Sequence, residues 1–386
     1  MCDSYECEQN DNSTLNGSSD SLASSQGPRK GDRRITHFDD SKCKKCSSPS
    51  PAVKVHAQGS HCRDCFLIYA RHKFRSTIGK EGIIPYGAKV VLAYSGGPAS
   101  TAMVKLLGDT LKETKKKANL NFDVKCVTVD LSFQNSEATI EFENMKNYCS
   151  KMGFELYVVS AKKWFADNAR VSYEDFMSIS DNTLKLDRQT QIIRKILTDF
   201  ACEHNFDWLM IGQSLFRSAV NALTQVCQGR GADLGSICKF SDSRMSKNVS
   251  IVFPMKEFTS KEVAFFNQFE NLKSFKFSDL ETGTDSNSSI QRLTEHFLLN
   301  LQIDFPAAAP NARNSGDKIV PRSSDEISAG ELCSLCLMPF DSTVEEAGTD
   351  NARVAASFSQ ELCNPDNLTD RTNKFCTYCK LEDIFG

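Results

Sequence analysis

The chain has 386 residues, of which 40% are hydrophobic and 25% are charged, and its formal net charge is −3. This composition is typical of a globular protein, and so small a net charge gives no global sign of nucleic-acid binding. The sequence has no signal-like apolar stretch near its start and no uninterrupted apolar run of about 18 residues, which argues against export and membrane spanning. We therefore expect a cytoplasmic protein with one large domain or two to three small ones.

The chain contains 16 cysteines, a high number for a protein without an export signal. In a reducing compartment such usage indicates metal ligation or thiol chemistry rather than disulfides. The beginning of the chain is rich in Ser, Asn, Asp and Gly, and we predict that residues 1–38 form a disordered tail. The spacing of the cysteines after this tail decides between metal ligation and thiol chemistry.

Two CxxC pairs follow the tail and are separated by fifteen residues. Each pair can supply two thiolates from one tight turn, so the spacing predicts a tetrahedral zinc site in a zinc ribbon. His56 and His61 are alternative ligands, although four cysteines already fill the coordination shell. The predicted ligands are Cys43, Cys46, Cys62 and Cys65.

Residues 66–80 follow directly and contain basic side chains, interleaved aromatic side chains and no acidic residue. A basic helix beside a zinc ribbon suits contact with a phosphate backbone, whereas a solvated basic face is the alternative interpretation. We assign the ribbon and this helix together to residues 39–80. The candidate RNA contacts in the helix are Arg71, Lys73 and Arg75.

Residues 88–107 read as a strand, a tight glycine turn and a helix. The glycines allow the backbone to approach a phosphate, and the first helical turn attracts an anion with its free N–H groups and its dipole. An ordinary strand–turn–helix of an α/β core is the alternative. The candidate nucleotide-binding residues are Ser95, Gly96, Gly97 and Ser100.

Strand-like and helix-like segments alternate after this loop, over a predicted domain of residues 81–305. The alternation predicts an α/β fold with a five-stranded parallel sheet covered on both faces, and it places the glycine loop at the carboxyl edge. Besides the strand before the loop, the predicted strands are 124–131, 156–160, 208–211 and 250–254, and the predicted helices include 136–152, 184–204, 219–226, 259–266 and 290–303.

The C-terminal region contains two more CxxC pairs, which are thirty-nine residues apart. We predict a polar linker over residues 306–330 and a second zinc-binding module over residues 331–386. Two unrelated cysteine pairs are the alternative, and Cys363 could replace one ligand. The predicted ligands are Cys333, Cys336, Cys376 and Cys379.

The Ser95-Gly96-Gly97 loop after a strand resembles the PP-loop ATP pyrophosphatases, of the adenine nucleotide alpha hydrolase-like fold. Members of that family adenylate an oxygen, often on a tRNA base, before a nucleophile displaces AMP. Zinc modules on both sides resemble its tRNA 2-thiolation branch. The further motifs that resemble the second subunits of cytoplasmic thiouridylases are 228–232, 240–244, 252–259, 261–265 and 288–294.

The chain departs from the catalytic pattern of this family at three places. Ala99 stands where the loop usually has an aspartate. Phe216 and Arg217 stand where paired carboxylates help to hold Mg²⁺, and neither side chain offers an oxygen ligand. Residues 180–188 contain no cysteine, whereas catalytic thiouridylases have a CxxC in the corresponding region.

The resemblance implies a non-catalytic or weakened subunit of a tRNA sulfurtransferase (thiouridylase) complex. The implied reaction is 2-thiolation of the wobble uridine, in the formation of 5-methoxycarbonylmethyl-2-thiouridine, in tRNAs for Lys, Glu and Gln. The implied partners are a catalytic thiouridylase in a heterodimer, tRNA and a ubiquitin-like sulfur carrier, with Zn²⁺ at two sites and ATP as a candidate ligand. Arg230 and Arg244 join the helix cations as candidate RNA contacts.

Two other functions are compatible with parts of the sequence. An autonomous ATP-dependent tRNA sulfurtransferase would use the glycine loop for ATP and would need other metal ligands, of which Asp130 is one candidate. A zinc-ribbon protein that binds RNA or DNA without modifying it would explain the cysteines and the basic helix. It would not explain the α/β domain with its glycine loop.

Overall fold

The computed structural model describes residues 40–55, 59–114, 121–131, 137–167, 173–231, 234–246, 248–275, 285 and 287–319. The predicted N-terminal tail and the C-terminal cysteine pairs lie outside the described residues. Within the described part, no helix has both the length and the apolar character needed to cross a membrane.

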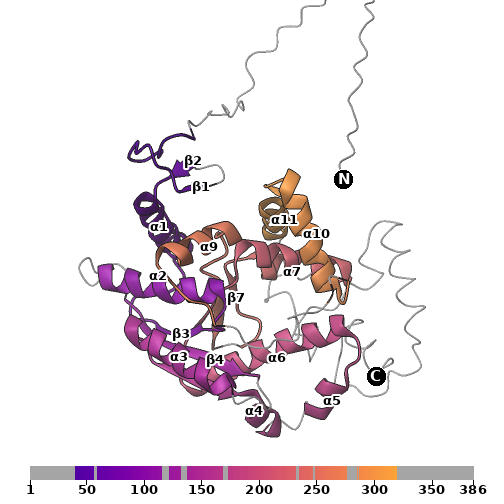
Figure 1. The fold of residues 1–386 in the computed structure, drawn as a ribbon. Helices are drawn as coiled ribbons and strands as arrows, with labels where there is room; N and C mark the ends of the chain where they lie inside the picture. The colour runs from indigo at the N-terminus through magenta and orange to yellow at the C-terminus, as the bar shows by residue number, and fades with distance from the viewer. Residues whose placement is uncertain are drawn as a thin grey trace, which may run out of the picture. The chain divides into compact units, whose positions relative to one another are not determined.

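A six-stranded sheet forms the centre of the α/β domain, in the order β5-β4-β3-β6-β8-β7 (Figure 1). The five predicted strands run parallel to one another, so the predicted sheet is confirmed. An antiparallel strand of two residues is added at one edge, and it is too short to produce a periodic sequence signal. The strands are β3 (Lys89–Ala93), β4 (Asp123–Asp130), β5 (Leu156–Ser160), β6 (Trp208–Ile211), β7 (Ser241–Asp242) and β8 (Ser250–Val252).

Helices cover both faces of this sheet, because side chains of alternating residues point to opposite faces of a strand. Val90 and Leu92 belong to one apolar core, whereas Val91 between them belongs to the other. The first core also contains residues of α1 (Arg63–Glu81), α2 (Pro98–Thr114), α3 (Glu137–Met152) and α9 (Ser260–Phe269). The second core contains residues of α6 (Asn182–Glu203), which also packs against α4 (Ala161–Asp167) and α5 (Tyr173–Ser178).

Four helices form a separate packed group beside the sheet: α7 (Leu215–Cys227), α8 (Leu234–Cys238), α10 (Ile290–Asp304) and α11 (Ala308–Asp317). The helix α11 corrects the prediction that 306–330 is a linker. Its contacts are made by small residues and a buried arginine and not by an apolar stripe: Ala309 is fully buried, a Cβ on Gly316 would lie 2.5 Å from the Cys238 sulfur, and Arg313 lies 3.0 Å from Glu257. A helix held by such contacts lacks the hydrophobic period on which sequence prediction depends.

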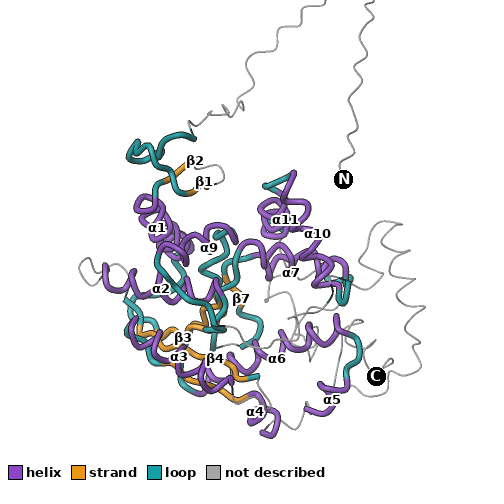
Figure 2. The backbone as a smooth tube through the Cα atoms, viewed as in Figure 1, coloured by secondary structure: helices purple, strands orange, loops and turns teal. Residues whose placement is uncertain are grey.

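The N-terminal module is a short antiparallel hairpin of β1 (Val53–Val55) and β2 (Gly59–His61) that leads into α1 (Figure 2). The predicted basic helix is therefore confirmed. It ends at Gly82, whose φ of 62° is the left-handed conformation that glycine adopts most readily at a helix end.

The buried Glu262 carboxylate joins this module to the α/β domain. Its oxygens accept hydrogen bonds from the Tyr69 hydroxyl at 2.9 Å and from the Lys73 ammonium at 2.8 and 2.9 Å. They also accept hydrogen bonds from the backbone N–H of Thr259 at 2.8 Å and from its hydroxyl at 3.0 Å, while Thr259 caps α9. The same carboxylate therefore serves both the start of α9 and the junction between α9 and α1.

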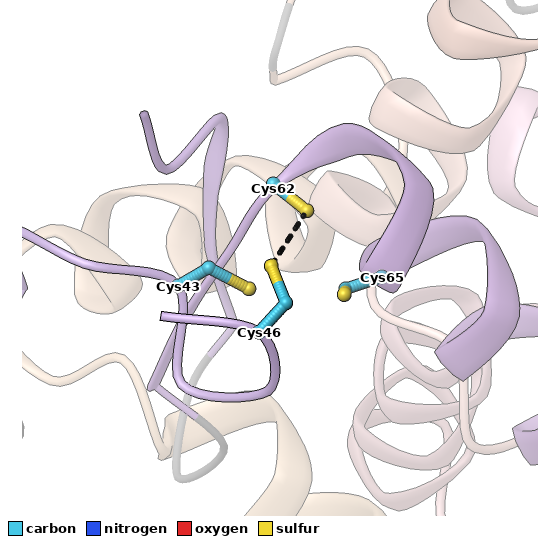
Figure 3. Close-up of side chains that lie close together, drawn as sticks. All are labelled: Cys43, Cys46, Cys62 and Cys65. Atoms are coloured by element: carbon cyan, nitrogen blue, oxygen red, sulfur yellow. Dashed lines mark hydrogen bonds between the residues drawn. The ribbon is translucent and has the colours of Figure 1, made fainter. Parts of the chain in front are cut away.

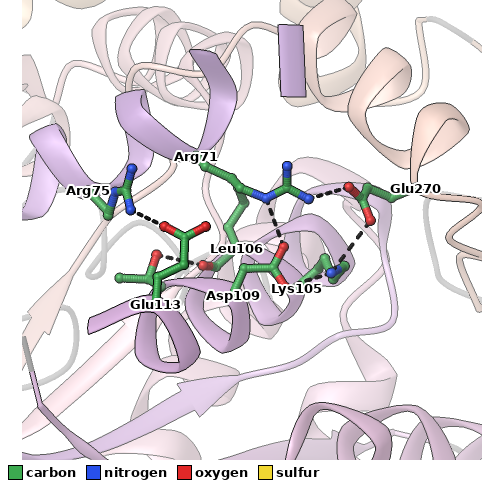
Figure 4. Close-up of polar contacts among 8 residues, drawn as sticks. Arg71, Arg75, Lys105, Leu106, Asp109, Glu113 and Glu270 are labelled. Carbon is green, nitrogen blue, oxygen red and sulfur yellow. Dashed lines mark hydrogen bonds and ion pairs between the residues drawn. The ribbon is translucent and has the colours of Figure 1, made fainter. Parts of the chain in front are cut away.

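A second group of charges connects α1 to α2 and to the end of α9 (Figure 4). Arg71 lies 2.9 Å from Asp109 and 2.5 Å from Glu270. Lys105 contacts the same two carboxylates at 2.6 and 3.5 Å. The side chains of all four are at most 22% exposed, so water screens these pairs less than it screens pairs at the surface.

We expect Glu262→Ala to lower the free energy of unfolding by about 3–5 kcal/mol, because it leaves the Lys73 ammonium and the Tyr69 hydroxyl without their acceptor. Glu143→Ala is the matched control, since the Glu143–Lys146 pair is 60% and 46% exposed. An exposed pair contributes only about 0–1 kcal/mol. Urea denaturation followed by circular dichroism measures both variants, and equal midpoints would contradict the role of Glu262.

Candidate functional site

The four N-terminal cysteines come together as predicted, with their sulfur atoms all within 4.8 Å of one another (Figure 3). Two of them lie in the loop before β1, and the other two lie at the start of α1. The loop is closed by a hydrogen bond from the Ser47 N–H to the Cys43 carbonyl oxygen at 2.7 Å, and the Lys44 N–H ties it to the Ser60 carbonyl oxygen of β2 at 2.8 Å. Four convergent thiols are the donor set of a tetrahedral structural metal site, so these residues fit a metal ion.

The surroundings give the four thiols different acidities. Burial raises the pKa of Cys43, but backbone N–H groups of Cys62, Cys46 and Lys45 outweigh it and lower the pKa to about 6. Burial and the neighbouring thiols raise the pKa of Cys65 to about 12. Cys43 is therefore a thiolate at neutral pH, whereas the Cys65 thiol would lose its proton on binding a metal.

His61 is not part of this cluster. It is buried, and its Nδ1 donates a hydrogen bond to the Gly59 carbonyl oxygen at 3.0 Å. The other alternative ligand, His56, lies outside the described residues. Among the residues that the structure describes, the four cysteines form the one group of three or more possible metal ligands.

The glycine loop lies between β3 and α2, as predicted. Gly96 has a φ of 76°, a conformation that a residue with a Cβ rarely adopts. The hydroxyl groups of Ser95 and Ser100 are 3.1 Å apart, and the Ser100 hydroxyl donates to the Gly97 carbonyl oxygen at 3.0 Å. Pro98 is the first residue of α2, where its missing N–H costs no helical hydrogen bond.

Three other segments hold this loop in place. A Cβ on Gly212, directly after β6, would lie 2.9 Å from the Ser100 Cα, so only glycine allows this approach of the two backbones. The Asn267 side chain of α9 donates to the Pro98 carbonyl oxygen at 2.9 Å. The Phe275 N–H donates to the Gly96 carbonyl oxygen at 2.9 Å. These supports have no motif in the sequence, apart from the position of Gly212 as a glycine at the end of a buried strand.

Phe216 and Arg217, at the positions where the sequence resemblance would place paired carboxylates, attach α7 to the helices α10 and α11. Phe216 is buried in an apolar core with Leu298 of α10 and Ala309 of α11. Arg217 lies 3.4 Å from Glu295 of α10. The first turns of both α2 and α7 contain no acidic residue. The beginning of α7 is therefore used for packing, whereas Asp130 at the end of β4 still provides a carboxylate at this edge of the sheet.

The three candidate RNA contacts on α1 are paired with carboxylates of the same chain. Arg71 and Lys73 make the contacts described above, and Arg75 contacts Glu113 of α2. Their side chains remain 22%, 20% and 33% exposed, respectively. Contact with RNA stays a prediction for these residues, and RNA phosphates would have to compete with the carboxylates.

The other two candidate RNA contacts are also paired. Arg230 lies 2.7 Å from Asp187 of α6, and its side chain is only 6% exposed. Arg244 lies 2.7 Å from Asp242 of β7. Burial raises the pKa of Asp242, but the hydrogen bonds and charge of Arg244 outweigh this effect, so the pKa is lowered overall. RNA contact stays a prediction here as well, and Arg230 would first have to leave its buried partner.

The parallel sheet with a Ser-Gly-Gly loop at its carboxyl edge defines the class of the protein, an α/β protein of the PP-loop fold. In agreement, the structure superposes on the U34-tRNA thiolase NcsA from Methanococcus maripaludis with a TM-score of 0.60, covering 76% of this chain and 95% of that chain at 22% identity. So low an identity shows the fold alone.

The sequence comparisons give a more specific similarity than the fold. The family model described as cytoplasmic tRNA 2-thiolation protein 2 matches residues 289–382. The proteins of that name from Danio rerio and Homo sapiens are 28% and 26% identical to this chain, covering 89% and 85% of it and 81% and 78% of their own lengths. The chain is therefore similar to cytoplasmic tRNA 2-thiolation protein 2 over most of its length.

The Methanococcus maripaludis thiolase contains a [4Fe–4S] cluster, a group that requires several cysteine thiolates. Outside the ribbon, the described cysteines form no group of three or more ligands. Residues 180–188, which contain no cysteine, include the start of α6, and Asp181 is the N-cap of that helix. The described part of this α/β domain therefore does not fit such a cluster.

We expect Gly212→Ala to destabilise the protein by about 1–3 kcal/mol, because the backbone of Ser100 has no room to move away from the new methyl group. Gly79→Ala on α1 is the matched control, since a Cβ there would meet no heavy atom within 4 Å. The control should be neutral or slightly stabilising, because alanine favours the helix by about 1 kcal/mol over glycine. Thermal unfolding distinguishes the two, and a neutral Gly212→Ala would contradict the close approach.

Proposed function

We propose that this chain acts in tRNA 2-thiolation as a non-catalytic or catalytically weakened subunit. The observation that carries the proposal is the similarity to cytoplasmic tRNA 2-thiolation protein 2 together with a PP-loop whose neighbouring helix starts contain no acidic residue. A hard cation that neutralises triphosphate oxygens needs carboxylate or other oxygen ligands. Catalytic PP-loop enzymes have carboxylates at the positions of Phe216 and Arg217. The packing of Phe216 and the pairing of Arg217 with Glu295 support a structural use of these positions in this chain.

In this proposal the chain forms a heterodimer with a catalytic thiouridylase, which transfers sulfur from a thiocarboxylated ubiquitin-like carrier to position 2 of the wobble uridine. The substrates are the tRNAs for Lys, Glu and Gln. The chain contributes a rigid platform and a surface for tRNA around the ribbon and α1. ATP at the Ser95–Ser100 loop is a candidate ligand, and the two hydroxyl groups would face its phosphates.

The N-terminal cysteines would hold Zn²⁺, which would fix the loop before β1 to the start of α1. A second Zn²⁺ is proposed at the C-terminal cysteine pairs, which lie outside the described residues. Zinc at the ribbon supplies structure and not catalysis, because four cysteine ligands leave no open position for a substrate.

An autonomous ATP-dependent tRNA sulfurtransferase is the second candidate function. It is favoured by the preserved geometry of the glycine loop and by the carboxylate of Asp130 at the same edge of the sheet. It requires turnover by the isolated chain, which the first proposal does not.

We expect the isolated chain to release no pyrophosphate and to form no 2-thiouridine in unmodified tRNA for Lys, in the presence of ATP, Mg²⁺ and the thiocarboxylated carrier. Adding the catalytic subunit should produce 2-thiouridine, measured by mass spectrometry of nucleosides. The catalytic subunit alone, and the pair without ATP, are the controls. Thiolation by the isolated chain would contradict the first proposal and support the second.

We expect Cys43→Ser to lower the zinc content of the purified chain by about one equivalent, because three thiolates hold the ion poorly. The matched control is Cys202→Ser, since Cys202 is exposed on α6 and should leave the zinc content unchanged. Atomic emission measures the metal. Because the ligands must be deprotonated, acidification should also release this zinc. An unchanged zinc content of Cys43→Ser would contradict the assignment.

A further inference from the structure

The helix α10 exposes large apolar side chains on its outer side. Leu293, Phe297, Leu299 and Ile303 are 51%, 55%, 50% and 77% exposed, and Phe305 directly after the helix is 63% exposed. The other large apolar side chains that are exposed in the described residues are scattered over several elements. Apolar groups gathered in this way mark an interaction surface more often than isolated ones do.

Helix geometry separates this outer face from the side of α10 that packs on α7. Leu293 and Phe297 are four residues apart, as are Leu299 and Ile303, so they form two rows along the helix that lie about 120° apart around its axis. The buried residues Thr294 and Leu298 form a third row, on which Leu298 belongs to the core shared with α7 and α11. The helix therefore has three apolar rows, and the row of Leu298 is the one that described residues cover, so the outer face consists of the other two.

We propose that the outer face of α10 is the docking surface for residues 331–381 of the same chain, the segment that contains the C-terminal cysteine pairs. The chain leaves α11 at Asp317, and α11 packs against α10 and α7, so the described chain ends beside α10. From residue 319 to residue 333 the chain can span at most about 50 Å, and α10 itself is only about 22 Å long. The whole face is within reach.

Two further observations favour this occupant. The family model starts at the N-cap of α10, Ser289, and continues to residue 382, so α10, α11 and the segment form one unit of the family. Both cysteine pairs have apolar neighbours: Leu335, Leu337, Met338 and Phe340 around the first, and Phe375 and Tyr378 around the second. A segment of this size buries too little apolar surface by itself and gains stability by covering a face such as this one.

The test places the photo-cross-linker p-benzoylphenylalanine at position 297 of the full-length chain, where it replaces an exposed aromatic side chain. We expect irradiation to produce cross-links within one chain to peptides of residues 331–381, identified by mass spectrometry. The same cross-linker at Ile140, which is 67% exposed on α3, is the matched control and should produce none to this segment. Covalent dimers, or cross-links to a co-purified protein in place of the segment, would overturn the proposal.

A second measurement does not depend on the cross-linker. We expect Ile303→Asp to increase the rate of limited proteolysis within residues 320–386 by about tenfold, since a charged side chain on the face favours the undocked segment. Ile140→Asp should leave this rate unchanged. Equal rates for the two variants would overturn the proposal, and circular dichroism verifies that both retain their helices.

Discussion

The buried carboxylate of Glu262 is the interaction on which the arrangement of this molecule depends. It belongs to the capping box at the start of α9, whose N-cap is Thr259, and it is at the same time the acceptor for two side chains of α1. A buried charge is tolerated only with good hydrogen-bond partners, so α1 and α9 have one favourable relative position. Because Asn267 of α9 also holds the Pro98 carbonyl oxygen, the constraint extends from the four-cysteine cluster through α1 to the glycine loop. The ribbon is thus a fixed part of the α/β domain and not an appendage.

The packing of α1 against α2 and α9 also pairs the cations of this basic helix with carboxylates. Its cations were predicted as RNA contacts because residues 66–80 contain no acid, yet the carboxylates that pair with them come from α2 and α9. Pairing fixes the direction of each cation and lowers the net charge of the surface. An RNA that binds here would therefore gain less from counterion release at these three cations than at unpaired ones.

The parts of the fold that could be predicted from the sequence are those with a local signal. Buried strands, long amphipathic helices, the Thr259 cap and the CxxC spacing each leave a pattern within about 20 residues. The parts that could not be predicted depend on distant partners: Tyr69 and Glu262 are 193 residues apart, and α11 is held by small residues that fit against α8. The candidate nucleotide site likewise has one part that the sequence predicts and one part that it does not. The glycine loop has a motif, whereas its supports, Gly212, Asn267 and Phe275, become visible only in three dimensions.

The glycine loop has a structural role that does not require a nucleotide. Its carbonyl oxygens accept hydrogen bonds from the Ser100 hydroxyl, from α9 and from the segment after α9, and its helix start lies in contact with the end of β6. The loop therefore connects α2 to α9 and to the end of β6, in addition to the direct pairing of β3 with β6. The loop geometry is therefore maintained by packing and hydrogen bonds of the chain itself, and it can be explained without a bound nucleotide. The start of α7 at the same edge of the sheet is likewise used for attachment, since Phe216 packs with residues of α10 and α11 and Arg217 lies 3.4 Å from Glu295 of α10.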